Sequence, residues 1–347
     1  MVHNYGSQLQ KFLILEKMRS QIYSYFNLVE EKYEKTDTTT LEVEFALPIQ
    51  SVLSLSLSDL GKVVTTSSTN TLPLECSRQT AKDCQVQRLD VIDLQVPTVN
   101  KPWYTGVTFL PGDRVMLTDY SNKQCILLSS SYQFITSHTL TGKPWNICVL
   151  DDQEVAVSLF NQNTIQILSV VDDVIRPVRM ITIKYKCNGI AAVGNGEMVV
   201  NSDCGNNKSA WSLSNTRGDV KCTHQYDYPY YDYNYIAINN MKAQVYVSVS
   251  CMNSLLCFDM NGRKQFTYSA DNLMCPKGVA VDKYDNIYVL GYLSNNIHQL
   301  SPDGSVIQVI TSGVPNCQWA VCIHKNNDVL IITNTSNRRK LYVYQLK

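Results

Sequence analysis

PKGVAVDKYDNIYVLGYLSNNIHQLSPDGSVIQVI, from Pro276 to Ile310, shows most clearly how the second half of this chain is built. A short apolar run, VAV, is followed by a turn rich in Asp and Asn and then by a second β-rich run, IYVLG. A polar Asn/Ser hairpin leads into a third such run. Short apolar runs bounded by Gly, Asn, Asp and Ser are typical of β-strands. The stretch therefore predicts a small unit of three or four short strands.

The same pattern recurs six times from residue 101 onward. The second strands read RVMLTD, EVAVSL, EMVVNS, QVYVSV, NIYVLG and DVLIIT, and their first apolar residues are Val115, Val155, Met198, Val245, Ile287 and Val329. The interval is about 42 residues, and a period of this length with several strands per unit is typical of propeller blades. The sequence therefore predicts a mainly β fold, a six-bladed β-propeller over residues 86–347.

One end of this region lacks a strand, and the other end has one in excess. The sixth unit ends with its third strand, KLYVYQLK, and a fourth strand is missing there. The strand-like segment VQRLDVIDLQV, Val86 to Val96, lies directly before the first unit. We therefore expect Val86–Val96 to pair with Leu341–Gln345 and close the ring, which removes the exposed edge strands that promote aggregation.

The N-terminal third has a different pattern. Residues 1–35 predict a short coiled-coil helix, because apolar residues alternate spacings of three and four along it. These residues are Leu15, Met18, Ile22, Tyr25 and Val29. Such a helix favours a homodimer through residues 8–35, although an amphipathic helix that packs on its own domain fits the pattern too. Residues 36–85 predict a linker with one strand-like segment, Leu41–Ile49.

Composition narrows the function classes. The chain has 347 residues with 30 basic and 30 acidic side chains, which argues against broad attraction to nucleic acid or an anionic membrane surface. No run approaches the roughly 20 apolar residues of a membrane span. The twelve cysteines form no C-x-x-C pair, so no zinc site is expected. Buried, reduced thiols in a cytoplasmic protein are the favoured interpretation, and a disulfide-bonded extracellular protein is the alternative.

One rim of the predicted ring gathers aromatic and amide side chains. The segments that lead into each first strand and the hairpins after each second strand lie on the same rim, because alternate connections share a face. Two residues before the first strands stand Thr105, Trp145, Asn188, Tyr235, Lys277 and Trp319, with Trp103 and Tyr104 beside the first of them. The hairpins add Tyr120, Asn122, Phe160, Asn161, Asn206, Tyr292, Asn295, Asn337 and Arg338.

Trp and Tyr are enriched at binding hot spots, so this rim is the candidate binding face for a protein partner. The candidate residues are Trp103, Tyr104, Tyr120, Trp145, Phe160, Asn188, Tyr235, Lys277, Tyr292, Trp319 and Arg338. A purely structural role, in which each Trp caps its own blade, stays open. The tyrosine-rich segment QYDYPYYDYNY, Gln225 to Tyr235, fits either a recognition loop or an outer strand.

Two other function classes deserve weight. A calcium-dependent propeller hydrolase or lyase needs several acids at the central channel. Only Asp119 and Asp203 stand near the inner ends of second strands, so we expect no catalytic, cofactor-binding or metal-binding residues. Single-stranded RNA binding needs a basic groove with stacking aromatics. Basic residues are sparse on the candidate rim, Lys277 and Arg338–Lys340 being the main ones, so a protein partner is favoured.

Pro276–Ile310 resembles an NHL repeat nearly from end to end, and the first two units resemble it less closely. The N-terminal stretch SQLQKFLILEKMRSQIYSYFNLVEE, followed by LEVEFALPIQSVL, resembles the coiled-coil exit and linker of tripartite-motif (TRIM) proteins. Together these resemblances cover most of the chain and suggest a TRIM protein with C-terminal NHL-like repeats.

The resemblance implies a role in the ubiquitin pathway. Full TRIM proteins of this kind carry a RING finger, which recruits a ubiquitin-charged E2 enzyme, and zinc-binding B-boxes. The Cys/His pairs of both modules are absent from this sequence. We therefore expect a truncated or RING-less member that recognises a substrate or adaptor and transfers no ubiquitin by itself.

Overall fold

The computed structural model describes residues 86–346, except 206–207, 228–233, 240–242, 325 and 327. The chain divides into two units at about residue 78, and every described residue belongs to the second. The predicted helix over residues 8–35 and the linker over 36–85 lie outside the described residues. Apart from two short 3-10 turns, Pro111–Asp113 and Ser250–Met252, the described regular structure is β-strand. The prediction of a mainly β fold is confirmed.

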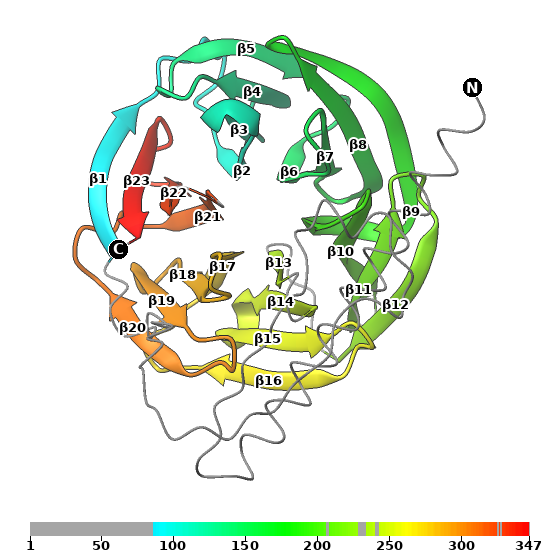
Figure 1. The fold of residues 1–347 in the computed structure, drawn as a ribbon, viewed down its shortest axis with the longest axis vertical. Helices are drawn as coiled ribbons and strands as arrows, with labels where there is room; N and C mark the ends of the chain where they lie inside the picture. The colour runs from blue at the N-terminus through cyan, green and yellow to red at the C-terminus, as the bar shows by residue number, and fades with distance from the viewer. Residues whose placement is uncertain are drawn as a thin grey trace, which may run out of the picture. The chain divides into compact units, whose positions relative to one another are not determined.

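The described strands form five antiparallel sheets arranged around a ring (Figure 1). Four sheets have four strands each. One comprises β2 (Tyr104–Phe109), β3 (Val115–Asp119), β4 (Gln124–Leu128) and β5 (Phe134–Thr139), and another comprises β13 (Ile236–Asn239), β14 (Gln244–Val249), β15 (Ser254–Asp259) and β16 (Lys264–Ser269). The third comprises β17 (Pro276–Val281), β18 (Ile287–Gly291), β19 (Asn296–Leu300) and β20 (Val306–Ile310). The fourth combines β21 (Gln318–Ile323), β22 (Val329–Asn334) and β23 (Lys340–Leu346) with β1 (Val86–Asp93) from the start of the region.

The fifth sheet has seven strands because one long strand serves two units. It comprises β6 (Pro144–Val149), β7 (Glu154–Leu159), β8 (Gln162–Val171), β9 (Val174–Gly194), β10 (Glu197–Gly205), β11 (Lys208–Asn215) and β12 (Val220–Tyr226). The first part of β9 pairs mainly with β8, and its last part pairs with β10. Dividing β9 at this point gives six four-stranded units, each with its first strand innermost. The second and third repeat units are therefore continuous, where separate sheets were expected.

The ring closes between its two ends. β1 pairs antiparallel with β23, from Asp93 opposite Lys340 to Val86 opposite Leu346. A bulge between Arg88 and Asp90 interrupts the register. The pairing predicted from the missing fourth strand is thus confirmed, although β1 ends before the predicted Val96. β1 covers the edge that β23 would otherwise expose.

Hydroxyl groups of the second strands link neighbouring units near the ring axis. Thr118 of β3 donates to the backbone oxygen of Trp145 at 3.1 Å, and Ser158 of β7 donates to that of Asn188 at 2.5 Å. Thr333 of β22 donates to the backbone oxygen of Tyr104 at 2.9 Å, which joins the sixth unit to the first. These donors are buried. Because buried hydrogen bonds are costly to break, they fix the first strands of the first, second and third units against the preceding units.

The connections define two rims. We call the rim formed by the segments leading into the first strands and by the hairpins between second and third strands the mouth rim. The turn rim carries the turns between first and second strands and between third and fourth strands. Successive connections of an antiparallel sheet fall on opposite sides, so the two rims face away from each other.

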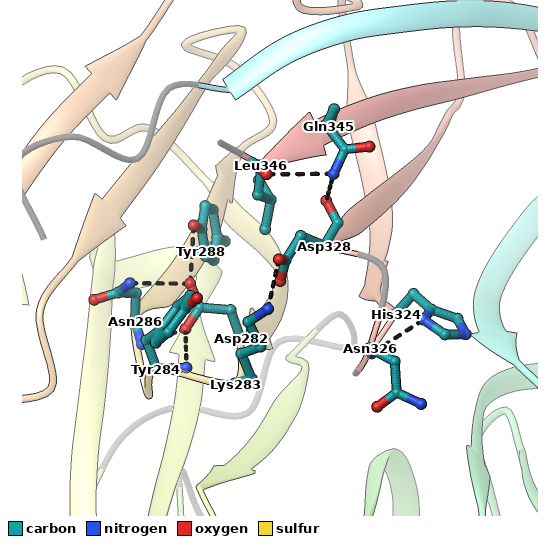
Figure 2. A network of polar contacts seen from close by, with 10 residues as sticks. All are labelled: Asp282, Lys283, Tyr284, Asn286, Tyr288, His324, Asn326, Asp328, Gln345 and Leu346. Carbon is teal, nitrogen blue, oxygen red and sulfur yellow. Dashed lines mark hydrogen bonds and ion pairs between the residues drawn. The ribbon is translucent and has the colours of Figure 1, made fainter. Parts of the chain in front are cut away.

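A buried carboxylate organises part of the turn rim (Figure 2). Asp282, between β17 and β18, accepts hydrogen bonds from the backbone and side-chain amides of Asn286, both at 2.9 Å. The adjacent Lys283 pairs with Asp328, just before β22, at 2.6 Å, and the backbone oxygen of Asp328 accepts the Gln345 amide at 3.1 Å. This network ties the fifth unit to the strand pair that closes the ring.

Deleting Val86–Asp93 from the full chain should open the ring. We expect the melting temperature to fall by roughly 10 °C or more, since a domain of this size loses about 2–4 °C per kcal/mol. Exposure of the β23 edge should also cause aggregation. Thermal unfolding and light scattering measure both effects. The variant Val178→Ala, at an exposed position of β9, should behave like the parent, and a deletion of Val86–Asp93 without effect would show that β1 does not hold the ring.

Candidate binding site at the mouth of the ring

Four of the six predicted rim positions are equivalent in the strand pairing: Thr105, Trp145, Asn188 and Lys277. Two residues after each of them, the first strand pairs with the third residue of the second-strand run, counted from Val115, Val155, Met198 and Ile287. In the sixth unit, which contains Trp319, the pairing is shifted by one residue, since Val321 pairs with Ile332, the fourth residue counted from Val329. In the fourth unit Ile236 pairs with Val247, so Asn234 takes this position and Tyr235 follows it. The placement of Tyr235 was therefore one residue off. The first strand of this unit begins nine residues before the second, one more than in most units.

Aromatic rings from five units meet between the innermost strands. Trp145 packs against Phe160, Trp319, Tyr120, Trp103 and Tyr235, with ring centroids 4.6, 5.8, 5.8, 6.0 and 6.3 Å apart. Trp319 also contacts Trp103 at 5.1 Å and Tyr292 at 5.3 Å. We call these seven residues the aromatic plug. Most of the pairs are tilted or edge-to-face, the arrangements that the charge distribution of aromatic rings favours.

Burial corrects the expectation of an exposed Trp/Asn rim. Trp145 is completely buried and Trp319 is 4% exposed. Tyr104, Asn188, Tyr235 and Lys277 are buried as well. Trp103, Tyr120, Phe160, Tyr292 and Arg338 keep partial exposure. The physical reason is that radially converging strands leave a space at the axis, and large rings fill it.

The asparagines of the mouth-rim hairpins hold the neighbouring loops. The side-chain oxygen of Asn122 accepts the backbone N–H of Asn100 at 2.8 Å. In the same way the side-chain oxygen of Asn253 accepts the backbone N–H of Cys275 at 2.7 Å, and the side-chain oxygen of Asn295 accepts the backbone N–H of Cys317 at 2.8 Å. These amides fix the segments that lead into the next first strands, which is a structural role.

Beside the plug, the mouth rim contains a pocket of about 360 Å³. It is lined by Trp103, Cys275, Lys277, Tyr292, Trp319, Thr335 and Arg338. Five of these residues belong to the candidate face predicted from the sequence, and Cys275 and Thr335 do not. The lining comes from the first, fifth and sixth units, so the pocket lies where the ring closes.

Lys277 places a buried amine at this pocket. Its Nζ donates to the Ser250 hydroxyl at 3.1 Å and lies 5.2 Å from the ring centroid of Trp319 and 5.8 Å from that of Tyr292. Burial lowers the pKa of Lys277 to about 8, while nearby thiols, Cys275 first, act in the opposite direction. The charged form therefore persists at neutral pH with less hydration than a surface lysine has.

Arg338 lies over the plug from the hairpin between β22 and β23. Its guanidinium carbon is 5.2 Å from the ring centroid of Trp103, and its Nε donates to the Thr335 backbone oxygen at 3.3 Å. Lys143 stands 4.6 Å from the Tyr120 ring centroid. Cations thus lie over several rings of the plug, an arrangement that cation–π attraction stabilises.

Exposed apolar side chains adjoin the pocket, and the sequence analysis missed them. Met252, Met274 and Leu293 are 48%, 45% and 56% exposed. The backbone N–H of Leu293 donates to the Met274 oxygen at 3.1 Å, so two of these side chains stand on directly bonded loops. We call the three residues the apolar flank. Their positions at the tips of otherwise polar turns were the signal in the sequence.

The neutral net charge conceals an uneven distribution. In the described connections of the mouth rim, the cations are Lys101, Lys123, Lys143, Arg338 and Arg339, and the acids are Asp227 and Asp271. The described turn rim instead carries Asp113, Asp151, Asp152, Asp172, Asp173, Asp219, Asp282, Asp285, Asp303 and Asp328, with Arg114, Arg217, Arg263 and Lys283. The mouth rim is therefore more basic than the sequence analysis expected, most of all around the first and sixth units.

The two acids weighed for a calcium site have structural partners. Asp119 is buried and accepts the backbone N–H of Trp103 at 3.0 Å and the Asn122 amide at 2.6 Å. Asp203 accepts the backbone N–H of Gly205 at 2.8 Å. Among the described residues, no three His, Cys, Asp or Glu side chains are grouped to hold a metal ion. The same part of the chain contains no helix with the length and hydropathy that a membrane crossing requires.

Solved structures of similar fold are β-propellers. Virginiamycin B lyase from Staphylococcus aureus is 14% identical with a TM-score of 0.52, over 76% of this chain and 89% of that one. The β-propeller domain of Cps50 (Swd1) from Myceliophteria thermophila is 8% identical with a TM-score of 0.53, over 70% and 82%. A protein of unknown function from Bacteroides thetaiotaomicron is 14% identical with a TM-score of 0.58, over 74% and 72%.

These likenesses establish the fold class alone, because all three identities are low. The ring of sheets is a β-propeller, as the repeat predicted. No protein-family model and no curated protein matches the sequence. Activity and partners must therefore be argued from the site.

Replacing Trp145 with Ala should destabilise the protein by about 3–5 kcal/mol, the usual cost of removing a large buried aromatic side chain. Chemical denaturation measures the change. Met274→Ala is the matched control, since truncating an exposed side chain usually changes stability by less than about 0.5 kcal/mol. Equal stability of the Trp145 variant and the parent would contradict the packing of the plug.

Lys277→Met should raise the free energy of unfolding at pH 7. The pKa of Lys277 falls from 10.5 to about 8 on folding, so the folded state binds its proton less tightly than the unfolded state. At about 1.4 kcal/mol per pKa unit, the gain is up to about 3 kcal/mol. It should shrink as the pH rises from about 8 toward 10.5, where the parent's lysine is neutral in both states. Denaturation at several pH values measures it, and a gain independent of pH would contradict the assignment to Lys277.

Proposed function

We propose that this chain is a non-catalytic protein-recognition module that binds its partner on the mouth rim. The observation that carries the proposal is the pairing of a formed pocket with the exposed apolar flank on one rim. Exposed apolar residues that gather beside a pocket mark interaction sites, and methionine is over-used on adaptable binding surfaces. The buried plug beneath them supplies the rigid base that a recognition surface needs.

The resemblance to TRIM proteins gives this recognition a proposed setting. In that setting, the six four-stranded units are the blades of an NHL-like propeller, and the mouth rim binds a ubiquitination substrate or an adaptor. The supporting observation is the Pro276–Ile310 unit, whose buried Asp282–Asn286 turn and Asn295 hairpin give physical roles to the polar residues of the repeat. Ubiquitin transfer is not proposed for this chain.

Single-stranded RNA is the second candidate ligand, and the cations of the mouth rim favour it. Base stacking, however, requires accessible aromatic faces. Trp319 is almost fully buried, Trp103 lies beneath Arg338, and Tyr120 lies beside Lys143. The plug therefore offers little free ring surface, and a protein ligand fits the rim better.

A display library of random ten-residue peptides, selected on the full chain, tests the function. We expect the selected peptides to bind the variants Met274→Glu and Leu293→Glu about ten-fold or more weakly than the parent. In these variants a charged side chain loses its water at a contact that is apolar in the parent. Fluorescence anisotropy of labelled peptides measures the affinities.

Val178→Glu is the matched control, because this valine is 44% exposed on the outer strand β9, away from the mouth rim, and should bind like the parent. Failure to select any peptide, with binding of a random ten-nucleotide RNA instead, would overturn the proposal in favour of RNA.

A further inference from the structure

The pocket on the mouth rim combines two cations with no acid. Its lining includes Lys277 and Arg338 and neither Asp nor Glu. Lys277 comes from the fifth unit and Arg338 from the sixth, and both lie against aromatic rings. In a partly desolvated site each cation acts more strongly on a ligand than it would in water. The pocket is therefore complementary to an anion.

The donor geometry of Arg338 points to a carboxylate. Arg338 donates its Nε to the Thr335 backbone oxygen, and within the described ranges no hydrogen bond of its terminal nitrogens is seen, so their planar fork can take a ligand. Such a fork binds a carboxylate with two parallel hydrogen bonds. Lys277 is held in place by the Ser250 hydroxyl and adds a second positive charge at the same pocket.

The surroundings of the pocket indicate what carries the carboxylate. The apolar flank lies beside the pocket, and the backbone of Cys275, a lining residue, continues directly from Met274. Leu293 follows Tyr292, another lining residue. A polypeptide segment with an acidic residue next to an apolar one would satisfy both surfaces at once.

We propose that this pocket binds the side-chain carboxylate of an Asp or Glu in an extended segment of a partner protein, and that a neighbouring apolar residue of that segment packs on Met274 and Leu293. This inference rests on the proposed function and names its ligand. The cations Lys101 and Arg339 on the same rim add a field that attracts an acidic segment before contact.

Binding should depend on pH through Lys277. The titratable and charged groups that face it are Cys251, Cys275, Tyr292 and Arg338. A bound carboxylate stabilises the protonated amine, so it raises the pKa of Lys277 above the value of about 8 in the free protein. Affinity should therefore be highest below pH 8 and fall as the pH rises above it.

The test uses the random ten-residue peptide library with the full chain as bait. The selected peptides should share an Asp or Glu next to Leu, Met or Phe. For one such peptide, replacing its Glu by Gln should weaken binding by about ten-fold or more. In Arg338→Gln and in Lys277→Met the Glu and Gln peptides should bind about equally. Lys277→Met should also lose the decline in affinity above pH 8.

Lys123→Gln is the control, because Lys123 is exposed on the same rim and does not line the pocket. This variant should keep the full preference for Glu over Gln. Arg338 is half-buried in a hairpin, so its variant tests the idea even if Lys277→Met alters the fold. Selected peptides without an acidic preference would overturn the inference and leave the proposed function standing. A Glu preference that survives in both pocket variants would also overturn it.

Discussion

The pairing of β1 with β23 is the constraint on which the site depends. It joins the start of the propeller to its end and thereby brings the first unit against the sixth. The backbone N–H of Leu94 continues the contact by donating to the Arg339 oxygen at 2.8 Å. As a result Trp103, which follows β1, lies under Arg338, which precedes β23. These two residues are far apart in the sequence, and without closure they would also lie apart in space, so the pocket would lose one wall.

The plug shows how converging blades bury aromatic residues that the sequence analysis placed on a binding face. Six first strands converge on one axis, and buried hydroxyl links hold three of them against their neighbours. Trp145 and Trp319 fill the remaining space and lose contact with solvent. Their burial supports a rigid base, on which Lys277 is kept charged at a cost in stability. Functional sites commonly carry groups with such perturbed pKa values, which is consistent with the proposed binding role of Lys277.

The sequence predicted the fold better than the site. The 42-residue period was sufficient to predict the blades, because hydrophobic periodicity encodes strand faces directly. The lack of a fourth strand after Lys340–Leu346 was sufficient to predict how the ring closes. Five of the seven pocket residues were also predicted. The solvent exposure of the candidate residues could not be predicted. Whether Trp145 faces water or its neighbours depends on how closely the blades approach each other, which the sequence pattern does not encode. The fourth unit's register could not be fixed either, because one added residue before β14 shifts Tyr235 without changing the hydrophobic pattern.

The most direct measurement is hydrogen–deuterium exchange of the full chain with and without a selected acidic peptide. The account predicts slower exchange on binding in the three mouth-rim segments that surround the pocket, residues 270–277, 292–295 and 335–340, with the turn rim unchanged. Protection confined to the turn rim, or protection spread evenly over all blades, would contradict the claim that the propeller recognises its partner at the mouth of the ring.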